Sequence, residues 1–475
     1  MKNTNIILLC TLFISIATSA QKTKKSVLIQ LDSQSEKYGA IAMKIWNLAE
    51  MGYLEEQSSS LLQQTLSNEG FTIKKGVANI PTAFVAEYGS GLPIIAILGE
   101  FDALPGLSQQ AVPEKKSANA EAGHACGHHL FGTASSAAAI AVKKWMQNTK
   151  QKGTIRFYGC PAEEGGGAKV YMAREGLFDD VDIALHWHPG SQNAASAAAA
   201  LANISAKFRF YGVSAHAAGA PEKGRSSLDG VEAMNAMVNM MREHVPQEAR
   251  IHYVITDGGK APNVVPDFAE VYYYSRHYSR EVVRSIFNRI VKAGEGAALG
   301  TGTTMKYEIV NGVHELLPNL TLQKLVHDNL TSIGGVTYSP DEKEFADKIA
   351  LSLGQKEADI DRALSIQPYK EEARAYGSTD VGDVSFVVPT VGFGTATWVP
   401  GTSAHSWQAV AAGGTTIGEK GMMVAAKTLT ATAIDLFQNK ELIEKATLEF
   451  NNRRGKSFIY KPLLGNRPPA LDYRK

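Results

Sequence analysis

Residues 93–99, Pro93-Ile94-Ile95-Ala96-Ile97-Leu98-Gly99, decide the fold because they form a continuous apolar run. Such a run is typical of a strand that is buried on both faces of a sheet. An alanine-rich stretch over 133–147 is expected to form a helix, and residues 154–158 are expected to form the next strand. Before this unit, residues 35–70 show helical spacing of their apolar positions. Strand, helix and strand in this order predict an α/β sheet with helices on both faces.

A second pattern begins near residue 205. Strands are expected at 206–211, 252–256, 269–275 and 304–310, and helices at 226–245 and 280–299. Their order along the chain, β-α-β-β-α-β, is that of a ferredoxin-like domain. A helix over 320–333 and an αβ stretch over 381–437 then return to the first pattern. We therefore expect an α/β domain built from 21–204 and 319–440, an inserted α+β domain at 205–318, and a C-terminal extension at 441–475.

The composition and the charge exclude several classes of protein. Of the 475 residues, 44% are hydrophobic and 20% are charged, which is the profile of a folded globular chain rather than a disordered one. The chain has 48 Lys and Arg against 47 Asp and Glu, so its formal net charge is +1. No basic excess favours binding to nucleic acid. These features indicate an enzyme or a protein that binds a small molecule.

The first twenty residues have the pattern of a secretory signal peptide. Lys2 precedes an apolar run over 6–16, and small residues over 17–20 predict cleavage after residue 20. The run is shorter than the ~20 residues that span a bilayer, so we expect a secreted or periplasmic protein without a membrane span. A membrane anchor or a lipid-anchored cysteine is the alternative. After cleavage Cys126 and Cys160 remain, and both a disulfide and metal binding are open for them.

Four segments are rich in metal-binding side chains, and each lies at or soon after the end of an expected strand. They are Gly123-His124-Ala125-Cys126-Gly127-His128-His129, Pro161-Ala162-Glu163-Glu164-Gly165-Gly166-Gly167, Ala184-Leu185-His186-Trp187-His188-Pro189 and Gly401-Thr402-Ser403-Ala404-His405-Ser406. Cys126, His128, Glu164, His188 and His405 would suffice for two metal ions if one ligand bridges them. A mixed set of thiolate, imidazole and carboxylate ligands suits zinc or a neighbouring transition metal. Each segment alone can also be a buried histidine or a solvated surface.

Within and near these segments, several residue roles stay open. In an extended chain His186 and His188 lie on the same face, so either can be the ligand. Of the adjacent Glu163 and Glu164, one can bind a metal while the other acts as a general base. Asp102, which follows the 93–99 strand, can orient a ligand histidine or cap a turn.

The inserted domain carries a polar cluster of its own. His216 ends the stretch Gly212-Val213-Ser214-Ala215-His216 after a strand, and Asn263 ends Gly258-Gly259-Lys260-Ala261-Pro262-Asn263 between two strands. These two side chains can close over a substrate and donate hydrogen bonds to an oxyanion, or they can cap their loops.

Several motifs, in this order, resemble those of the dinuclear metallopeptidases of the aminoacylase and glutamate-carboxypeptidase type, peptidase family M20. They are His124-Ala125-Cys126-Gly127-His128, Pro161-Ala162-Glu163-Glu164-Gly165, Gly212-Val213-Ser214-Ala215-His216-Ala217-Ala218 and Gly401-Thr402-Ser403-Ala404-His405-Ser406. The match is to the amidohydrolase branch. Gly99-Glu100-Phe101-Asp102-Ala103-Leu104-Pro105-Gly106-Leu107-Ser108-Gln109 and Gly377-Ser378-Thr379-Asp380-Val381-Gly382-Asp383-Val384 are most similar to its aminobenzoyl-glutamate hydrolases.

The resemblance implies a zinc-aminopeptidase-like catalytic domain, with a mixed sheet flanked by helices. It also implies that the inserted ferredoxin-like domain is a lid through which two chains form a homodimer. The implied cofactors are two divalent ions, zinc or manganese, bridged by the Cys126 thiolate. The other implied ligands are His128, Glu164, His405 and, of the two open histidines, His188.

Five more residues have expected roles, three of them (Glu163, His216 and Asn263) by the same resemblance. Glu163 is the implied general base, and Asp102 supports a ligand histidine. His216 and Asn263 match lid groups that reach the partner's active site in family dimers, and His216 would stabilise the oxyanion. Asn263 and Arg276 are candidates for binding the substrate carboxylate.

The implied reaction is hydrolysis of an amide bond in an N-acyl or aminobenzoyl amino acid, or in a dipeptide-like substrate. A metallo-dipeptidase or aminopeptidase that needs a free N-terminus is the alternative enzyme. A secreted, non-catalytic binding protein is a third hypothesis, and it predicts loss of the base or of a ligand.

Overall fold

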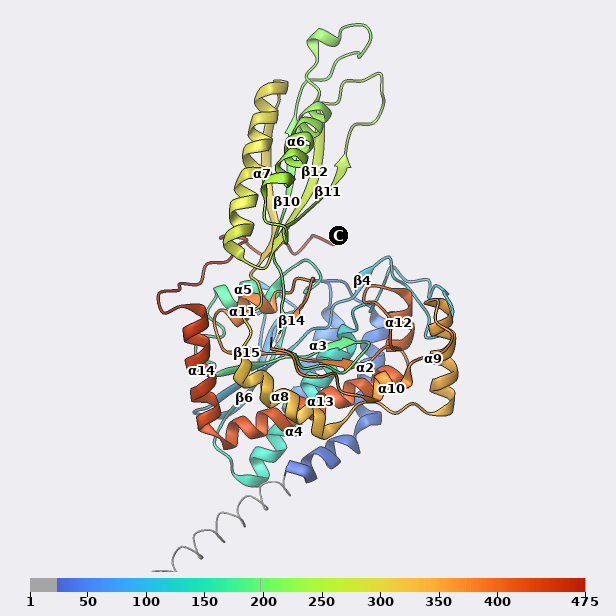
Figure 1. The fold of residues 1–475 in the computed structure, drawn as a ribbon, viewed down its shortest axis with the longest axis vertical. Helices are drawn as coiled ribbons and strands as arrows, with labels where there is room; N and C mark the ends of the chain where they lie inside the picture. Colours follow the sequence, from blue (N-terminus) through green and yellow to red (C-terminus); the bar gives the residue numbers. More distant parts are fainter. Residues whose placement is uncertain (1–23, 197, 372, 475) are drawn as a thin grey trace, which may run out of the picture.

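The structure is a computed structural model that describes residues 24–196, 198–371 and 373–474. The expected signal peptide at 1–20 lies outside the described residues. Figure 1 shows a broad body of helices around a sheet, with a narrow second body standing above it and the C-terminus between the two. Among the described helices, none combines the length and the apolar character needed to cross a bilayer.

The broad body is built on a six-stranded sheet with the strand order β1-β2-β6-β3-β7-β15. The strands are β1 (Thr72–Lys75), β2 (Phe84–Ser90), β3 (Ile94–Gly99), β6 (Gly153–Gly159), β7 (Ile183–Leu185) and β15 (Thr390–Val391). The first two pairs are antiparallel and the remaining three are parallel. This arrangement confirms the mixed sheet implied by the sequence.

The apolar run of β3 packs on both faces of the sheet. Ile95 and Ile97 join one hydrophobic core, whereas Ala96 and Leu98 join another on the opposite face. The first core is covered by α2 (Ser35–Leu48), α3 (Glu56–Asn68), α4 (His128–Thr149), α8 (Leu320–Ile333), α13 (Thr416–Gln438) and α14 (Lys440–Arg454). The second is covered by α5 (Ala168–Arg174) and α11 (Val381–Ser385). Successive side chains of a strand point to opposite faces, which explains why this run has no polar position.

The narrow body is a four-stranded antiparallel sheet with the order β11-β12-β10-β13. Along the chain its elements are β10 (Ala202–Tyr211), α6 (Ser227–Met241), β11 (Arg250–Asp257), β12 (Phe268–His277), α7 (Arg280–Thr301) and β13 (Thr304–Val313). The two helices pack against one face of the sheet around a core of its own. The β-α-β-β-α-β order is therefore the one expected from the sequence, and we call this body the lid.

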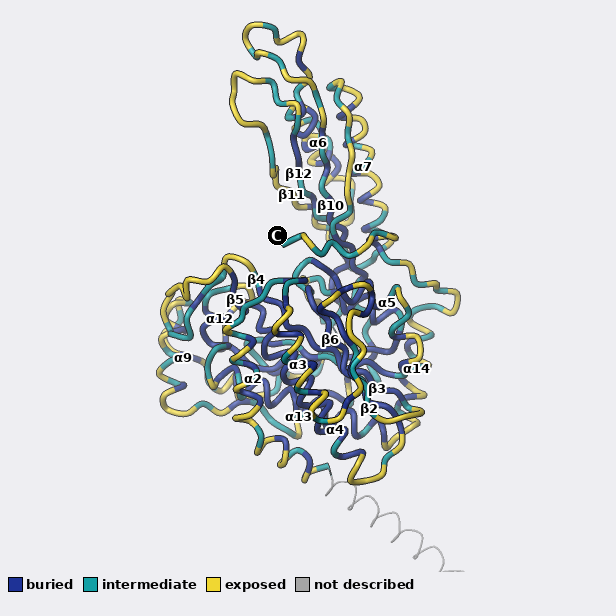
Figure 2. The backbone as a smooth tube through the Cα atoms, turned by 180° about the vertical axis from the view of Figure 1, so that it is seen from behind, coloured by how far each residue is buried: buried dark blue, intermediate teal, exposed yellow. Residues whose placement is uncertain are grey.

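Smaller elements complete the broad body. The helices α9 (Pro340–Ser352) and α12 (Trp407–Gly413) pack around Trp398, near α10 (Ile360–Leu364). Two-stranded pairs form between β8 (His188–Gly190) and β16 (Gly394–Ala396), β9 (Ala198–Ala199) and β14 (Ala373–Arg374), and β4 (Leu104–Pro105) and β5 (Ala122–Gly123). In Figure 2 the buried segments run through both bodies, and exposed segments cover the outer helices and the loops at the lid tip.

Two local expectations differ from the structure. The helix expected at 133–147 begins earlier, at His128, because Gly127 adopts the left-handed conformation (φ 76°) and lets the chain turn directly into α4. The helical stretch expected over 35–70 is divided into α2 and α3 by a loop in which Ala49 and Tyr53 have positive φ. Both differences bring polar residues toward the edge of the sheet where strand β3 ends.

Candidate metal centre and substrate cavity

The four ligand-rich segments meet at the carboxyl ends of β3, β6 and β7. The carboxyl ends of parallel strands lie along one edge of a sheet, which is where α/β proteins bind ligands. A cavity of about 1650 Å³ lies here between the catalytic edge and the lid. Its walls include Cys126, Glu163, Glu164, His188 and His405. The sequence therefore predicted which segments would come together.

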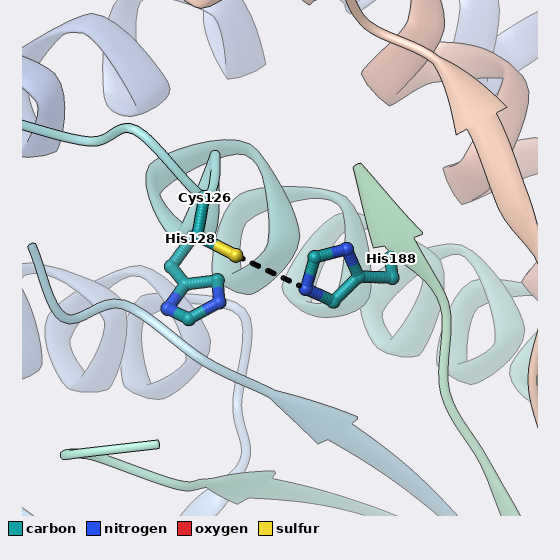
Figure 3. A group of neighbouring side chains, drawn as sticks. All are labelled: Cys126, His128 and His188. Carbon is teal, nitrogen blue, oxygen red and sulfur yellow. Dashed lines mark hydrogen bonds between the residues drawn. The ribbon is translucent and has the colours of Figure 1, made fainter. Parts of the chain in front are cut away.

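Two groups of possible metal ligands share one residue. Cys126, His128 and His188 form the first group, and Cys126, Glu164 and His405 form the second. In each group the ligand atoms lie within 4.8 Å of one another. Figure 3 shows the first group, in which Sγ of Cys126 lies 3.5 Å from Nε2 of His188. This arrangement can hold two ions with the thiolate between them.

Cys126 is buried, and it forms no disulfide with Cys160, since both cysteines are free. Burial raises the pKa of the Cys126 thiol far above its usual range. A thiol in such surroundings loses its proton only when a cation lies close by. Gly127 places this thiol, because a Cβ at residue 127 would lie 2.7 Å from Cβ of Pro189. Of the two alternatives for Cys126, the structure supports metal binding.

The two histidines of the first group are held so that their Nε2 atoms face the thiol. Nδ1 of His128 lies 2.8 Å from Oδ1 of Asp102, and Nδ1 of His188 lies 2.8 Å from the carbonyl oxygen of Pro189. Both partners accept hydrogen bonds, so Nδ1 carries the proton in each ring. Burial and the nearby His128 lower the pKa of His188 to about 4, which keeps its Nε2 lone pair free.

Asp102 connects two of the ligand segments, because its two carboxylate oxygens bind His128 and the backbone of Glu164. Its Oδ2 accepts a hydrogen bond from the backbone N–H of Glu164 at 2.9 Å, while Oδ1 holds His128. Burial opposes ionisation, but the charge and hydrogen bond of His128 hold the pKa of Asp102 below its usual value. Asp102 therefore orients a candidate ligand and also holds the turn that carries Glu164.

The turn after β6 presents its two glutamates in different directions. Ala162 has φ 53° and donates its N–H to Oε1 of the buried Glu55 at 2.8 Å. Glu164 then faces His405, with Oε1 and Nε2 3.0 Å apart. Glu163 lies instead with Glu100 and His128 in a third group of possible metal ligands. Burial and the carboxylates of Glu100 and Glu164 raise the pKa of Glu163 well above its usual value, as is common for a catalytic acid or base.

Behind the ligands lies a buried ion network that the sequence did not reveal. Nζ of Lys169 lies 2.7 Å from Oε1 of Glu100 and 2.6 Å from Oδ1 of Asp380. Oε2 of Glu100 in turn lies 3.2 Å from Nε2 of His128. The side chains of all four residues are at most 1% exposed. Asp380 belongs to a motif that the resemblance singled out, but no local pattern marks Lys169.

His186 and His188 have different surroundings despite their shared strand face. His188 belongs to the first ligand group, whereas His186 belongs to neither group. Nε2 of His186 is buried without a hydrogen-bond partner, and the ring packs so closely on Gly392 that a Cβ there would collide with it. The geometry thus favours His188 as the ligand.

The three predicted site residues of the lid lie at two different ends of it. Arg276 lies opposite Asn203 at the base of the lid and lines the cavity. Tyr211 lies opposite Phe268 at the other end of the same pair of strands, about 26 Å away at ~3.3 Å per residue. His216 follows the end of β10 and Asn263 precedes the start of β12, so both residues lie beyond this far end, and both are exposed. The two loops are joined there by the backbone N–H of Ala217, which donates to the carbonyl oxygen of Asn263 at 3.0 Å.

His216 and Asn263 therefore lie away from the cavity of their own chain, and the oxyanion role expected for His216 stays a prediction. The reason is strand direction. β10 runs from the base of the lid to its tip, so a loop that follows this strand must lie at the tip.

The sequence reasoning also missed two residues near the C-terminus. Tyr473 and Arg474 both donate hydrogen bonds to the carbonyl oxygen of Glu164, at 3.2 and 2.6 Å. Both side chains line the cavity. They lie in a stretch with no helix or strand pattern, so no periodicity could have indicated them.

Comparisons with known proteins agree with this geometry. The model of Peptidase family M20/M25/M40 matches residues 96–408. The chain is 40% identical to one of the subunits of the p-aminobenzoyl-glutamate hydrolase of Escherichia coli K12, over 93% of this chain and 97% of that protein. It is 28% identical to the Xaa-Arg dipeptidase of Mus musculus, over 92% and 94% of the two chains.

The fold is shared with solved structures as well. The crystal structure of the Bacillus subtilis YXEP protein, described as a dinuclear metal-binding peptidase of the M20 family, matches with a TM-score of 0.58. The match covers 86% of this chain and 99% of that one at 17% identity.

Proposed function

Because the chain belongs to Peptidase family M20/M25/M40, we propose that it uses two divalent metal ions to hydrolyse the amide bond of an N-acyl or aminobenzoyl amino acid. The observation that carries this proposal is the pair of ligand groups that share Cys126. The similarity to the Escherichia coli p-aminobenzoyl-glutamate hydrolase supports the substrate class.

The donor atoms fit metal ions. Nε2 of His128 and Oε2 of Glu100 are buried without hydrogen-bond partners, so the site contains polar atoms that only an added cation or proton can satisfy. The mixture of thiolate, imidazole and carboxylate suits zinc, and we infer zinc or manganese as the ions. Bound by Cys126, His128, His188, Glu164 and His405, such ions would lower the pKa of a water and polarise a carbonyl.

The protein's own residues would then move the protons and hold the substrate. Glu163, which belongs to neither group that shares Cys126, accepts the proton of the attacking water and returns it to the leaving amine. Asp102 keeps His128 in the required tautomer. Arg276 lines the cavity with its Nε buried and unpartnered, so its guanidinium is free to bind the substrate carboxylate.

A turnover assay on reconstituted protein tests the proposal. The purified chain is stripped with a chelator, reloaded with Zn²⁺ or Mn²⁺, and offered benzoyl-amino acids, aminobenzoyl-glutamate and free dipeptides. We expect metal-dependent release of the amino acid from the acylated substrates. Protein that holds no transition metal and gains no turnover with any of them would refute the proposal. Hydrolysis of free dipeptides alone would favour the alternative activity, that of a dipeptidase, which the similarity to the Xaa-Arg dipeptidase supports.

We further propose that the chain acts as a homodimer through the lid. Strand β11 is an edge of the lid sheet and exposes Tyr253, Val254 and Ile255, which are 36%, 55% and 41% exposed. An unpaired edge with apolar side chains is suited to pairing with a second copy. In such a dimer His216 and Asn263 would reach the other chain's cavity. Mixing inactive E163Q and H216A proteins should then restore part of the activity, since a mixed dimer keeps one intact site.

Residues 1–20 support a location outside the cytoplasm. We propose that they are removed as a signal peptide and that the mature protein is secreted or periplasmic. Sequencing the N-terminus of the protein recovered from the periplasm or the medium tests this. A mature chain beginning at Gln21 is expected, and an intact Met1 on cytoplasmic protein would contradict it.

A further inference from the structure

Residues 457–474, which we call the C-terminal strap, connect the catalytic body to the lid. Tyr460 donates its hydroxyl to the buried Asp383 at 2.7 Å, and Arg174 donates to the carbonyl oxygen of Arg467 at 2.8 Å. Two neighbouring residues of the strap lie in different cores. Leu463 is part of the lid core, whereas Leu464 is part of the core between the sheet, α5 and α11.

The strap also binds the base of the lid directly. The Arg467 guanidinium donates to the carbonyl oxygen of Val310 at 2.8 Å and forms an ion pair with Glu308 at 3.1 Å. Gly312 of β13 lies against the strap so closely that a Cβ there would be 2.8 Å from Cβ of Leu463. The strap is thus packed into both bodies at the point where the lid joins the catalytic body, and Figure 1 shows the C-terminus in this gap.

The end of the strap reaches the turn that carries Glu163 and Glu164. Tyr473 and Arg474 donate to the carbonyl oxygen of Glu164, and the Tyr473 ring packs edge-on against Tyr53 with centroids 5.5 Å apart. A Cβ at Gly52 would collide with the Tyr473 hydroxyl. The position of these two strap residues is therefore built into the surrounding structure.

Arg474 differs from most other basic residues of the cavity because it has no carboxylate partner. Lys207, Arg209 and Arg467, which line the same cavity, are paired with Glu270 or Glu308. Within the described part of the chain, Arg474 forms no ion pair, and its Nε is buried without a hydrogen-bond partner. Asp472 also lines the cavity, but it is exposed and forms no ion pair with Arg474.

Arg474 and Arg276 line the same cavity as two tyrosines of β12. The Arg276 guanidinium stacks over the Tyr274 ring at 5.2 Å, and the Tyr274 and Tyr272 ring centroids lie 5.2 Å apart. Tyr272 and Tyr274 line the cavity together with Arg276 and Arg474. Among the described residues, the cavity therefore contains two guanidinium groups without carboxylate partners, and that of Arg276 stacks on its tyrosine wall.

We propose that Arg474 is a specificity-determining residue that binds a second carboxylate of the substrate, so that the preferred substrates are N-acyl derivatives of glutamate or aspartate. This inference rests on the proposed function, in which Arg276 binds the first carboxylate. A guanidinium in a partly buried site is suited to a carboxylate, because it offers several donors in one plane. The strap supplies this group to a site whose metal ligands lie elsewhere in the chain.

The test compares benzoyl-glutamate with benzoyl-glutamine, which has nearly the same shape but lacks the second charge. In the wild-type enzyme we expect kcat/KM to favour benzoyl-glutamate by about 10- to 100-fold, the usual range for a charge-assisted hydrogen bond. R474Q should lower this ratio toward one. Both substrates will share any loss that comes from the missing bond to Glu164, so the ratio is the readout. R453Q, which removes an exposed guanidinium from α14, should leave the ratio unchanged.

Several results would overturn the inference. An R474Q enzyme that loses equal activity on both substrates would show that Arg474 only positions the Glu164 turn. An unchanged ratio would show that Arg474 does not bind the second carboxylate. If R474Q does not fold, R474K is the second variant, because it keeps the positive charge but loses the planar guanidinium. R474K should lower the ratio of kcat/KM for benzoyl-glutamate over benzoyl-glutamine several-fold. An unchanged ratio in R474K would also refute the inference. Failure of the wild-type enzyme on every acylated amino acid would instead refute the proposed function.

Discussion

Lys169 allows a sharp test of how the site is held together, because its ammonium group is completely buried between two carboxylates. Nζ lies 2.7 Å from Glu100 and 2.6 Å from Asp380, and all three side chains are at most 1% exposed. In K169M the volume is nearly kept, but the positive charge is lost. Breaking a buried ion pair by removing one partner costs about 3–5 kcal/mol of the free energy of unfolding.

The cost of keeping a buried carboxyl protonated gives a similar magnitude by a separate route. Burial already raises the pKa of Glu100 and of Asp380, with Lys169 acting against it. Without Lys169, at least one of the two carboxyls must stay protonated in the folded state. At about pH 7.5 this costs about 5 kcal/mol, because an unfolded carboxyl has a pKa near 4 and each unit is worth about 1.4 kcal/mol.

The same reasoning fixes the sign of the pH dependence. A carboxyl whose folded pKa is raised above the unfolded value contributes stability at low pH that is lost as the pH rises through the folded pKa. The K169M penalty should therefore be smaller at about pH 5.5 than at about pH 8. Urea unfolding in the presence of a chelator, followed by tryptophan fluorescence, measures both values without a contribution from bound metal.

Two controls make the K169M result specific. The double variant K169M/D380N removes one of the stranded carboxylates and should recover part of the lost stability. K343M removes an exposed lysine that pairs with Asp347 on α9, and such surface pairs are worth at most about 1 kcal/mol. A K169M penalty below about 1 kcal/mol, or one that does not change with pH, would refute the reasoning.

Three further predictions concern the general base Glu163, the metal ions, and Asp383, the buried carboxyl that accepts a hydrogen bond from Tyr460 of the strap. E163Q should lower kcat by about 10²- to 10⁴-fold while the metal content, measured by elemental analysis, stays unchanged, because Glu163 belongs to neither group that shares Cys126. Chelation should lower the thermal unfolding temperature, and Zn²⁺ or Mn²⁺ should restore it, since ions at 100 times their dissociation constant add about 2.7 kcal/mol. Burial raises the pKa of Asp383 to about 7, so this group should make the wild-type protein lose stability as the pH rises from about 4 to 7, and D383N should flatten that slope in urea unfolding.

Each of these predictions has a contrary outcome. Metal loss in E163Q would make Glu163 a ligand rather than the base. If a chelator changes the unfolding temperature of neither the wild type nor C126S, this would argue against ions bound at the Cys126 thiol. A D383N variant with the same pH slope as the wild type would show that Asp383 is ionised throughout this range.

The sequence could predict the fold and the convergence of the ligand segments because both depend on local pattern. The run Ile94-Ile95-Ala96-Ile97-Leu98 reveals a strand buried on two faces without any knowledge of its neighbours. Segments that follow such strands must meet at one edge of the sheet. Cys126, Glu164 and His188 could therefore be grouped before their contacts were known.

The remaining features depend on contacts between distant parts of the chain. Lys169 is one lysine in a short helix, and only the fold places it beside Glu100 and Asp380. Arg474 lies 310 residues from the carbonyl group it binds, in a stretch without periodicity. The sequence correctly placed the loop of His216 after a strand. Which end of that strand faces the cavity depends on how the lid is attached to the catalytic body, and the strand pattern does not contain this information.

The balance of charge in the site gives a physical reason for the chain to bind cations. The site brings together the carboxyls of Glu100, Asp102, Glu163, Glu164 and Asp380, of which Glu100 and Asp380 pair with the fully buried Lys169. Burial acts to raise the pKa of each carboxyl. Charges in such surroundings must be neutralised by protons or by cations. Burial opposes protonation of His128, but Cys126, Asp102 and Glu100 raise the pKa of this ring well above its usual value. Divalent ions would replace these protons, and metal uptake should therefore release protons and become tighter as the pH rises.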